Sequence, residues 1–412
     1  MKAIYTSLYA TLLIFIISFS LENTFAASNL YLKKQSDKQF INAYYAEQLT
    51  SPEKKKRKSF SQFGYGLSFF AFPLFPISEF VDPDNFGEHS YGKPALKEKN
   101  GSLYTCKGGF IDFSHVRVAA DWTVYLTFKI ITEDTKEMDL PSSDGQLKLQ
   151  LKKVNNLSLD DIISMSQKIA YERLIWHELS SWYYHLPNYT FNEQQSTFTP
   201  EDTYSNFFGT IIGRNIALRI LQNRDSLPYE QIATEEIQKE IAKLQPVSSK
   251  KQSKEAYDIV DASKQQNLPE AEQNMDVWWD SKVLFRDQRY VFKRYTATGP
   301  YLNPWLVPKA DKVGCFDIKP TVLFVPQKTK NGASLYNYYT LTIIPDSLLF
   351  FDKKTHEQLH EPFGTFTSKN MSKIIAHVSN DMQQELLAGY NKRNEKNPER
   401  HYKKLRKVWF RK

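Results

Sequence analysis

The sequence lacks the motifs that identify many common classes of enzyme. Its 412 residues include two cysteines, Cys106 and Cys315, and neither stands in a CxxC pattern. A thiolate zinc site and a thioredoxin-type redox site are therefore not indicated. There is also no GxSxG nucleophile elbow, no P-loop, no dinucleotide-binding fingerprint and no internal repeat. Any chemistry must come from residues that the fold brings together.

The two cysteines lie far apart in the sequence, and two interpretations of them stay open. In an oxidising compartment they would form one disulfide that closes a long loop, which chain-entropy estimates value at about 4 to 5 kcal/mol. Two separate buried thiols are the alternative, because cysteine is among the most buried residue types.

The first 26 residues have the features of a cleavable secretory signal peptide. Lys2 is followed by a predominantly apolar run over residues 8–19 and then by the small residues Ala26 and Ala27, which is the expected order of charged, apolar and cleavage regions. The run is shorter than the roughly 20 residues of a spanning helix. No later segment is apolar enough to span. We therefore expect a periplasmic or secreted protein without a transmembrane segment after its signal peptide.

The sequence is 41% hydrophobic and 14% aromatic, as in a folded protein. Residues 27–391 are long enough for one large domain, which is what we expect. The net charge of +8 is uneven, because the tail at residues 392–412 holds ten Lys or Arg and two Glu. Such a tail could bind anionic lipid or a polyanionic envelope polymer, or be a solvated terminus. No nucleic-acid module is present, so nucleic acid is not an expected partner.

The hydrophobic pattern predicts an α+β fold in which central helices pack with a mainly antiparallel sheet. Strands are expected where β-branched and aromatic residues gather or where apolar residues alternate with polar ones. Helices are expected where such periodicity continues without Gly or Pro. The expected strands are 122–131, 147–151, 290–296, 321–325 and 336–344; the expected helices are 159–184, 199–221 (with Thr199 and Pro200 as N-cap and first residue), 229–244 and 369–387; residues 245–274 read as a polar segment.

Several motifs resemble one family. They include YTCKGGFIDFSHVRVAADWT at residues 104–123, YERLIWHELSSWY at 171–183 and FTPEDTYSNFFGT at 198–210, and also VDPDNFGEHSY, VWWD and PWLVP. These stretches resemble the hallmarks of an exported bacterial family that is catalogued only as a domain of unknown function. Together they span nearly the whole mature chain. The resemblance implies no activity, substrate or cofactor.

Acidic residues and histidines concentrate between residues 82 and 206. Asp112 and His115 are three residues apart, and Asp121 follows six residues after His115. If this segment is helical or tightly turned, an imidazole and one or two carboxylates could converge. That combination is a ligand set of catalytic zinc and of non-haem metals.

A second histidine lies beside a glutamate on the helix expected at 159–184. His177 and Glu178 resemble the start of the HExxH motif, in which two histidines one turn apart bind zinc beside a glutamate base. Position 181 is serine, so only one imidazole is present, and His185 lies about 10 Å beyond Glu178 on a continuous helix. Other segments would have to supply the remaining ligands.

We therefore expect either a metal-assisted hydrolase of the cell envelope or a non-enzymatic envelope protein that binds lipid or polymer. In the first case the imidazoles of His115 and His177 should lie within about 5 Å of each other. In the second the same residues serve as caps, dipole partners and internal ion pairs. The predicted site comprises Glu178 as general base, His115, His177, Asp112 and Asp121 as ligands of zinc, and His89, Glu201 and Asp202 as further candidates.

Overall fold

The computed structural model describes residues 35–44, 80–92, 98–133, 136–140, 145–183, 201–223, 227–266, 301–307, 309–316, 318–345, 357 and 362–377. The predicted signal peptide, the basic tail and the strand expected at 290–296 lie outside these ranges. No helix within the described ranges is both long enough and apolar enough to cross a membrane.

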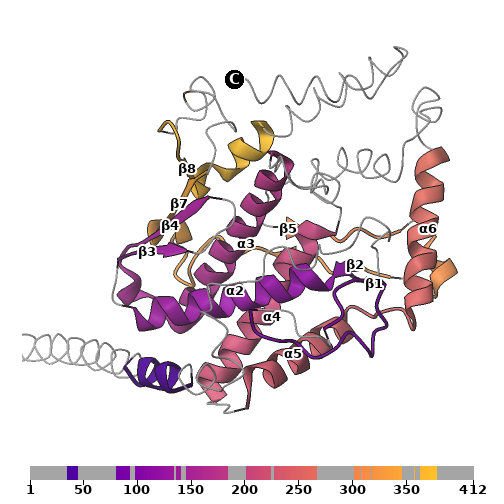
Figure 1. Cartoon of the computed structure of the whole chain (residues 1–412), viewed down its shortest axis with the longest axis horizontal. Coiled ribbons are helices and arrows are strands. Elements are labelled where there is room, and N and C mark those ends of the chain that lie inside the picture. Colours follow the sequence, from indigo (N-terminus) through magenta and orange to yellow (C-terminus); the bar gives the residue numbers. More distant parts are fainter. Residues whose placement is uncertain are drawn as a thin grey trace, which may run out of the picture.

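Three long helices occupy the centre of the fold (Figure 1). They are α2 (Phe113–Thr132), α3 (Leu159–Tyr183) and α4 (Asp202–Asn223), and α2 contacts both of the others. The helices α5 (Tyr229–Lys243) and α6 (Lys250–Gln266) lie outside them. Residues 35–44 form a further helix, in which the hydroxyl of Tyr44 donates to the carbonyl of Leu227 at 3.0 Å.

The strands form three antiparallel sheets, which confirms the predicted α+β class. The largest sheet has the strand order β3-β4-β7-β8, with β4 paired to β7 over six residue pairs, and it lies beside α3 in Figure 1. The bounds are β1 Ser102–Thr105, β2 Gly109–Asp112, β3 Glu137–Leu140, β4 Gln146–Leu151, β5 Tyr301–Leu302, β6 Leu323–Phe324, β7 Tyr339–Ile344 and β8 Phe366–Thr367, with short 3-10 helices at Val154–Asn156, Ala310–Val313, Leu335–Asn337 and Ser368–Asn370.

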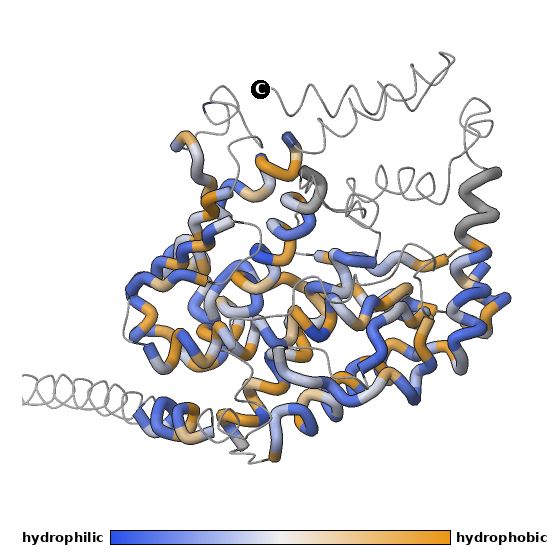
Figure 2. Tube along the Cα trace, viewed as in Figure 1, coloured by the Kyte–Doolittle hydropathy of each residue, from blue (hydrophilic) through white to orange (hydrophobic). Residues whose placement is uncertain are grey.

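Residues 122–131 are helical, so the prediction of a strand there was wrong. They belong to α2, in which every residue from Trp122 to Phe128 is buried. Hydrophobic residues recur along α2 itself (Figure 2). A helix that is buried all round loses the periodicity that distinguishes it from a strand. The hydroxyls of Thr123 and Thr127 donate to the carbonyls four residues earlier, which satisfies them inside the helix.

Other predicted elements agree with the structure to within a few residues where they fall in the described ranges; Thr199, Pro200 and residues 378–387 lie outside these ranges. The helix α3 begins at the expected residue, α5 ends one residue earlier than expected, and the strand predicted at 147–151 is β4. The segment at 245–274, predicted only as polar, instead contains α6. Its few buried residues include Ser253 and Ala256, which leaves a weak apolar signal for this helix.

Two glycines allow α4 to cross α2 at close range. A Cβ atom at Gly209 would lie 2.3 Å from the carbonyl oxygen of Val116, and one at Gly213 would lie 2.5 Å from that of Ala120. The contacts advance in the same direction along both helices, so α2 and α4 run parallel. Their N-terminal ends therefore lie together.

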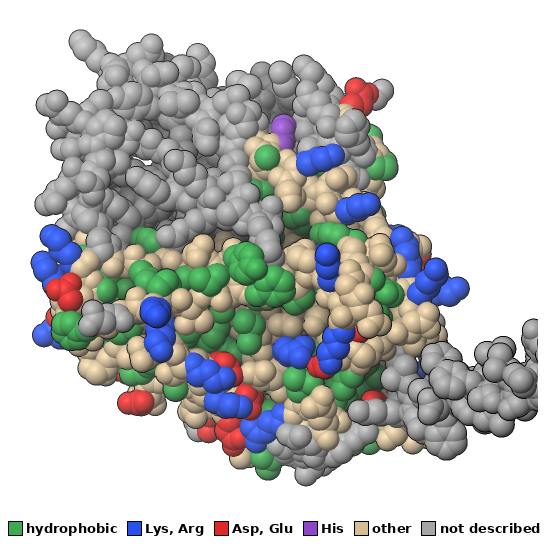
Figure 3. Space-filling view, turned by 180° about the vertical axis from the view of Figure 1, so that it is seen from behind, with side chains coloured by type: hydrophobic (Ala, Val, Ile, Leu, Met, Phe, Trp, Pro, Cys, Tyr) green, Lys and Arg blue, Asp and Glu red, His purple; other side chains and the backbone are tan. Residues whose placement is uncertain are grey.

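Apolar side chains also gather on the surface. Seen from behind, they form a band across the middle of the molecule, above a margin with many charged groups (Figure 3). In the described part of the chain the exposed large hydrophobic residues are Tyr301, Phe316, Val322, Phe324 and Phe363.

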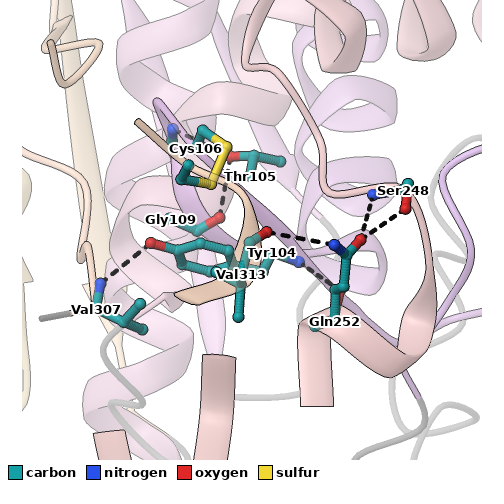
Figure 4. Close-up of a disulfide and its surroundings, with 11 residues drawn as sticks. Tyr104, Thr105, Cys106, Gly109, Ser248, Gln252, Val307 and Val313 are labelled. Carbon is teal, nitrogen blue, oxygen red and sulfur yellow. Dashed lines mark hydrogen bonds between the residues drawn. A yellow bond between two sulfur atoms is a disulfide. The ribbon is translucent and has the colours of Figure 1, made fainter. Parts of the chain in front are cut away.

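Cys106 and Cys315 form a disulfide, which resolves the alternative that the sequence left open. The bond joins the turn between β1 and β2 to the segment after residues 310–313, and the two cysteines have a sequence separation of 209. Tyr104 packs in the same region (Figure 4), where its hydroxyl accepts a hydrogen bond from the backbone N–H of Val307 at 3.2 Å. The amide of Gln252 on α6 bonds to the carbonyl of Val313 nearby at 3.5 Å.

Candidate metal centre

Asp112 positions the start of α2 and one edge of the candidate site. It ends β2 and forms the N-cap of α2, with its Oδ1 accepting from the backbone N–H groups of Ser114 and His115. Its own backbone N–H donates to the hydroxyl of Ser205 on α4 at 3.0 Å. The other carboxylate oxygen, Oδ2, faces the imidazole of His115 at 3.5 Å from Nδ1.

His115, on α2, lies among carboxylates from the end of β2, from α3 and from α4. Its Nε2 is 3.2 Å from Oε1 of Glu178 on α3, and its Nδ1 is 3.7 Å from Oδ1 of Asp202 at the start of α4. This arrangement follows from the parallel packing of α2 and α4 and from the position of Glu178 in the C-terminal half of α3. We call Asp112, His115, Glu178 and Asp202 the His115 cluster.

The cluster is mostly buried and opens on one side. The side chains of Asp202 and Glu178 are 1% and 5% exposed, whereas those of His115 and Asp112 are 17% and 23% exposed. Solvent therefore reaches the cluster from the side of α2.

The carboxylates of the cluster favour the protonated imidazole. Burial opposes the charge on His115, but Asp202 and Asp112 outweigh it and raise the pKa of His115 well above its ordinary value of 6.5. Burial also acts to raise the pKa of Asp112, but the charge and hydrogen bonds of His115 lower it to about 2. The cluster thus contains three carboxyl groups and a single imidazole.

A divalent cation fits this set of groups. His115, Glu178 and Asp202 each offer one ligand atom, and these atoms lie within 4.8 Å of one another. One imidazole with carboxylate oxygens suits zinc and manganese, whereas thiolate-preferring metals find no ligand here. Among the described residues, Nδ1 of His115 is buried without a well-formed hydrogen bond, although two carboxylate oxygens lie near it. A cation that replaces the proton on this nitrogen would satisfy it, because metals bind the neutral imidazole.

Two other predicted residues lie next to the cluster without belonging to this ligand group. His177 precedes Glu178 on α3 and is half-buried, and its backbone carbonyl accepts from the hydroxyl of Ser180 at 2.8 Å. Glu201 is the residue before α4, and its carbonyl accepts from the backbone N–H of Ser205. On α3, the residue that belongs to the ligand group is therefore Glu178.

The remaining predicted residues, His89 and Asp121, form a separate cluster. Nε2 of His89 is 2.7 Å from Oδ1 of Asp121, and its Nδ1 is 3.1 Å from Oε1 of Glu98. The hydroxyl of Tyr229 on α5 also donates to Oδ1 of Asp121, at 2.5 Å. Asp121 lies about 240° around α2 from His115, because six residues separate them, and so faces a different part of the fold.

This second group, which we call the His89 cluster, is a closed network. Both ring nitrogens of His89 contact a carboxylate, and Oδ2 of Asp121 accepts from the backbone N–H of Gly92 at 3.0 Å. Burial opposes the charge on His89, but Asp121 and Glu98 outweigh it and raise the pKa of His89 to about 9. Glu98 and Tyr229 stand in no motif with His89, so no local pattern pointed to them as its partners. The network ties α2 and α5 to the loop at residues 87–92.

Comparison with known proteins supports the family resemblance. A family model described as "Protein of unknown function (DUF4056)" matches residues 48–308. No curated protein and no solved structure matches the chain.

Proposed function

The chain belongs to this family of proteins of unknown function, and from the geometry of the His115 cluster we propose that it is a metal-assisted hydrolase that acts on a component of the cell envelope. The observation that carries the proposal is the convergence of His115, Glu178 and Asp202 from three different helices. The His89 cluster is also assembled from distant segments, but both of its ring nitrogens are hydrogen-bonded. In the His115 cluster Nδ1 of His115 has no hydrogen bond to any residue that the structure describes, and the side chains of His115 and Asp112 are partly exposed.

Each residue of the cluster has a role in this proposal. His115, Glu178 and Asp202 hold the cation, and Asp112 fixes the start of α2, and with it the backbone of His115, as the N-cap of that helix. A bound divalent cation would polarise a carbonyl or phosphoryl oxygen and lower the pKa of a bound water. The exposed edge at His115 and Asp112 gives substrate a way to approach.

The envelope is proposed as the place of action on two grounds. The first 26 residues have the pattern of a signal peptide. The disulfide between Cys106 and Cys315 is the kind of bond that persists in the periplasm or outside the cell. Cell walls and membrane lipids are the polymers and esters that a hydrolase would meet there.

Metal analysis tests the proposal directly. Full-length mature protein purified without chelator should contain about one zinc or manganese per chain, because the cluster offers one ligand set. His115→Ala should lose that metal, since it removes the only imidazole of the set. His177→Ala is the matched control, because it removes the neighbouring histidine on α3 that lies outside the set, and it should keep the metal. Metal-free wild-type protein, or full occupancy in His115→Ala, would contradict the proposal.

Glu178→Gln separates two roles of this residue. If Glu178 is a ligand, the amide should lower metal content. If Glu178 is instead the general base, metal should stay bound while hydrolysis is lost. Hydrolysis is measured as release of soluble fragments from purified cell walls and of fatty acid or headgroup from phospholipid vesicles. Release that is equal in the wild type and in His115→Ala would exclude this cluster as the active site.

A non-enzymatic protein that binds an envelope polymer is the second candidate. The rings of Tyr301 and Phe324 lie 5.5 Å apart on paired strands and are 61% and 53% exposed. Exposed aromatic groups of this kind are common at binding surfaces. Retention of the protein on cell walls that is lost in Tyr301→Ser/Phe324→Ser, together with absence of metal, would favour this candidate.

A further inference from the structure

The amide of Asn206, one turn after Asp202 on α4, is buried and lacks hydrogen-bond partners among the described residues. The side chain is 0% exposed, and neither its Oδ1 nor its Nδ2 has a hydrogen-bond partner in the described part of the chain. A buried amide without partners is costly, so native proteins rarely keep one unless a water, ion or ligand satisfies it.

The helix geometry places Asn206 between α2 and α3. Each residue of a helix is rotated by about 100° from the one before it. Viewed down the axis of α4, the side chain of Ser205 therefore leaves the helix at about −60° from that of Asp202, Asn206 at about 40° and Phe207 at about 140°. The hydroxyl of Ser205 bonds to the N-cap of α2, and the ring of Phe207 packs 5.3 Å from that of Tyr171 on α3. The direction of Asn206 falls between these two contacts.

Asn206 therefore lies one turn below Asp202, on the stripe that continues to Gly209 and faces α2. Because His115 and Asp112 form the exposed edge of the site, Asn206 lies toward its closed end. Thr203, one residue after Asp202, also has a buried hydroxyl with no hydrogen-bond partner among the described residues. Two side chains with unsatisfied polar atoms, Thr203 and Asn206, thus lie in the first turns of α4, next to the proposed ligand Asp202.

We propose that Asn206 is a further ligand of the cation, through its Oδ1, at the closed end of the His115 cluster. This inference rests on the proposed metal site and extends its ligand set to one imidazole nitrogen, two carboxylates and one amide oxygen. Such an oxygen-rich set suits Mn²⁺ and Zn²⁺ and disfavours soft cations such as Cu⁺.

Titration of Mn²⁺ and Zn²⁺ into chelator-stripped full-length protein tests this ligand. Asn206→Leu removes the amide oxygen at similar volume and should weaken binding of Mn²⁺ at least about tenfold. Asn206→Asp restores an oxygen ligand and should bind Mn²⁺ at least as tightly as the wild type. Asn215→Leu is the control on the same helix, because the amide of Asn215 bonds to Glu240 at 2.8 Å and lies away from the site; it should leave metal affinity unchanged.

The melting temperatures of the metal-free variants separate a ligand from a structural residue. Asn206→Leu removes an unsatisfied polar group, so its metal-free form should be at least as stable as the wild type. Wild-type Mn²⁺ and Zn²⁺ affinity in Asn206→Leu would overturn this inference while leaving the proposed metal site intact. A wild-type protein that binds neither ion would overturn both.

Discussion

At the scale of single residues, His89 makes folding dependent on pH. Its folded-state pKa of about 9 exceeds the ordinary value of 6.5 because Asp121 and Glu98 contact both ring nitrogens. A raised pKa stabilises the fold fully below pH 6.5, and this contribution is lost as the pH rises through 9. The difference corresponds to about 3 kcal/mol of unfolding free energy. Arg117 also interacts electrostatically with Glu98 and Asp121. It does not add to the pH dependence, because an arginine side chain stays protonated in proteins.

Melting temperature against pH measures this effect. The wild type should lose stability between pH 7 and 10 more steeply than His89→Gln, which cannot carry the charge. The variant should be less stable at pH 6, because two buried carboxylates lose their cation. Parallel curves for the two proteins over this range would show that His89 is not a buried cation.

Asp112 shows how one residue serves both structure and site. One of its oxygens caps α2, and the other faces His115. The sequence interpretations of a simple cap and of a site residue were therefore not exclusive. A carboxylate has enough acceptor positions for both.

At the scale of elements, the crossing of α2 and α4 sets the distance between His115 and Asp202. Gly209→Ala would force its new methyl group against the backbone of Val116, and overpacking of this kind typically costs about 1 to 3 kcal/mol. Because Asp202 lies two turns away on the same stripe, the shift should also weaken metal binding.

Chemical denaturation and metal titration of Gly209→Ala check both effects. Gly332→Ala is the control, because a Cβ atom there would meet nothing within 4 Å and only its positive φ of 81° is strained. We expect the control to lose about 1 kcal/mol and to keep its metal affinity. If Gly209→Ala and Gly332→Ala had the same metal affinity, the crossing of α2 and α4 would not be what positions the site.

Sequence patterns predicted elements better than contacts between them. The helix α3 was found within one residue, because a long segment without Gly or Pro favours a helix. The strand predicted at 122–131 failed, because composition cannot separate a fully buried helix from a strand. For the site, the spacing of three residues between Asp112 and His115 correctly predicted that their side chains lie close together.

Contacts between distant segments could not be read from the sequence. His177 and Glu178 are adjacent, yet their side chains leave α3 about 100° apart, and only the packing of α3 against α2 selects Glu178. Asp202 and Asn206 become relevant because α4 runs parallel to α2. No local motif encodes that direction.

At the scale of the whole molecule, the folded structure extends past the end of the family match. The match ends at residue 308. Both β7, which pairs with β4, and Cys315, which is bonded to Cys106, come after that residue. Residues 309–377 therefore complete structure that begins within the matched region. They include the partner strand of β4 and one end of the disulfide.

The disulfide should stabilise this closure. A bond that spans 209 residues restricts the unfolded chain, and disulfides typically contribute about 2 to 5 kcal/mol. It also anchors the β1–β2 turn, directly before the strand that ends at Asp112. We therefore expect Cys106→Ser/Cys315→Ser to fold with a lower melting temperature. It should keep the metal, because β2 retains its pairing with β1 and the hydrogen bond from Asp112 to Ser205.

Thermal unfolding with and without a reducing agent isolates the bond from the loss of side-chain packing. Reduction should lower the melting temperature of the wild type toward that of the double variant, and it should leave the double variant unchanged. Because Cys106 is 8% exposed and Cys315 is 5% exposed, reduction should be slow in the folded protein and fast in denaturant. A wild type whose melting temperature is the same after complete reduction would show that the bond contributes nothing to stability, and that the pairing of β4 with β7 holds the C-terminal segment by itself.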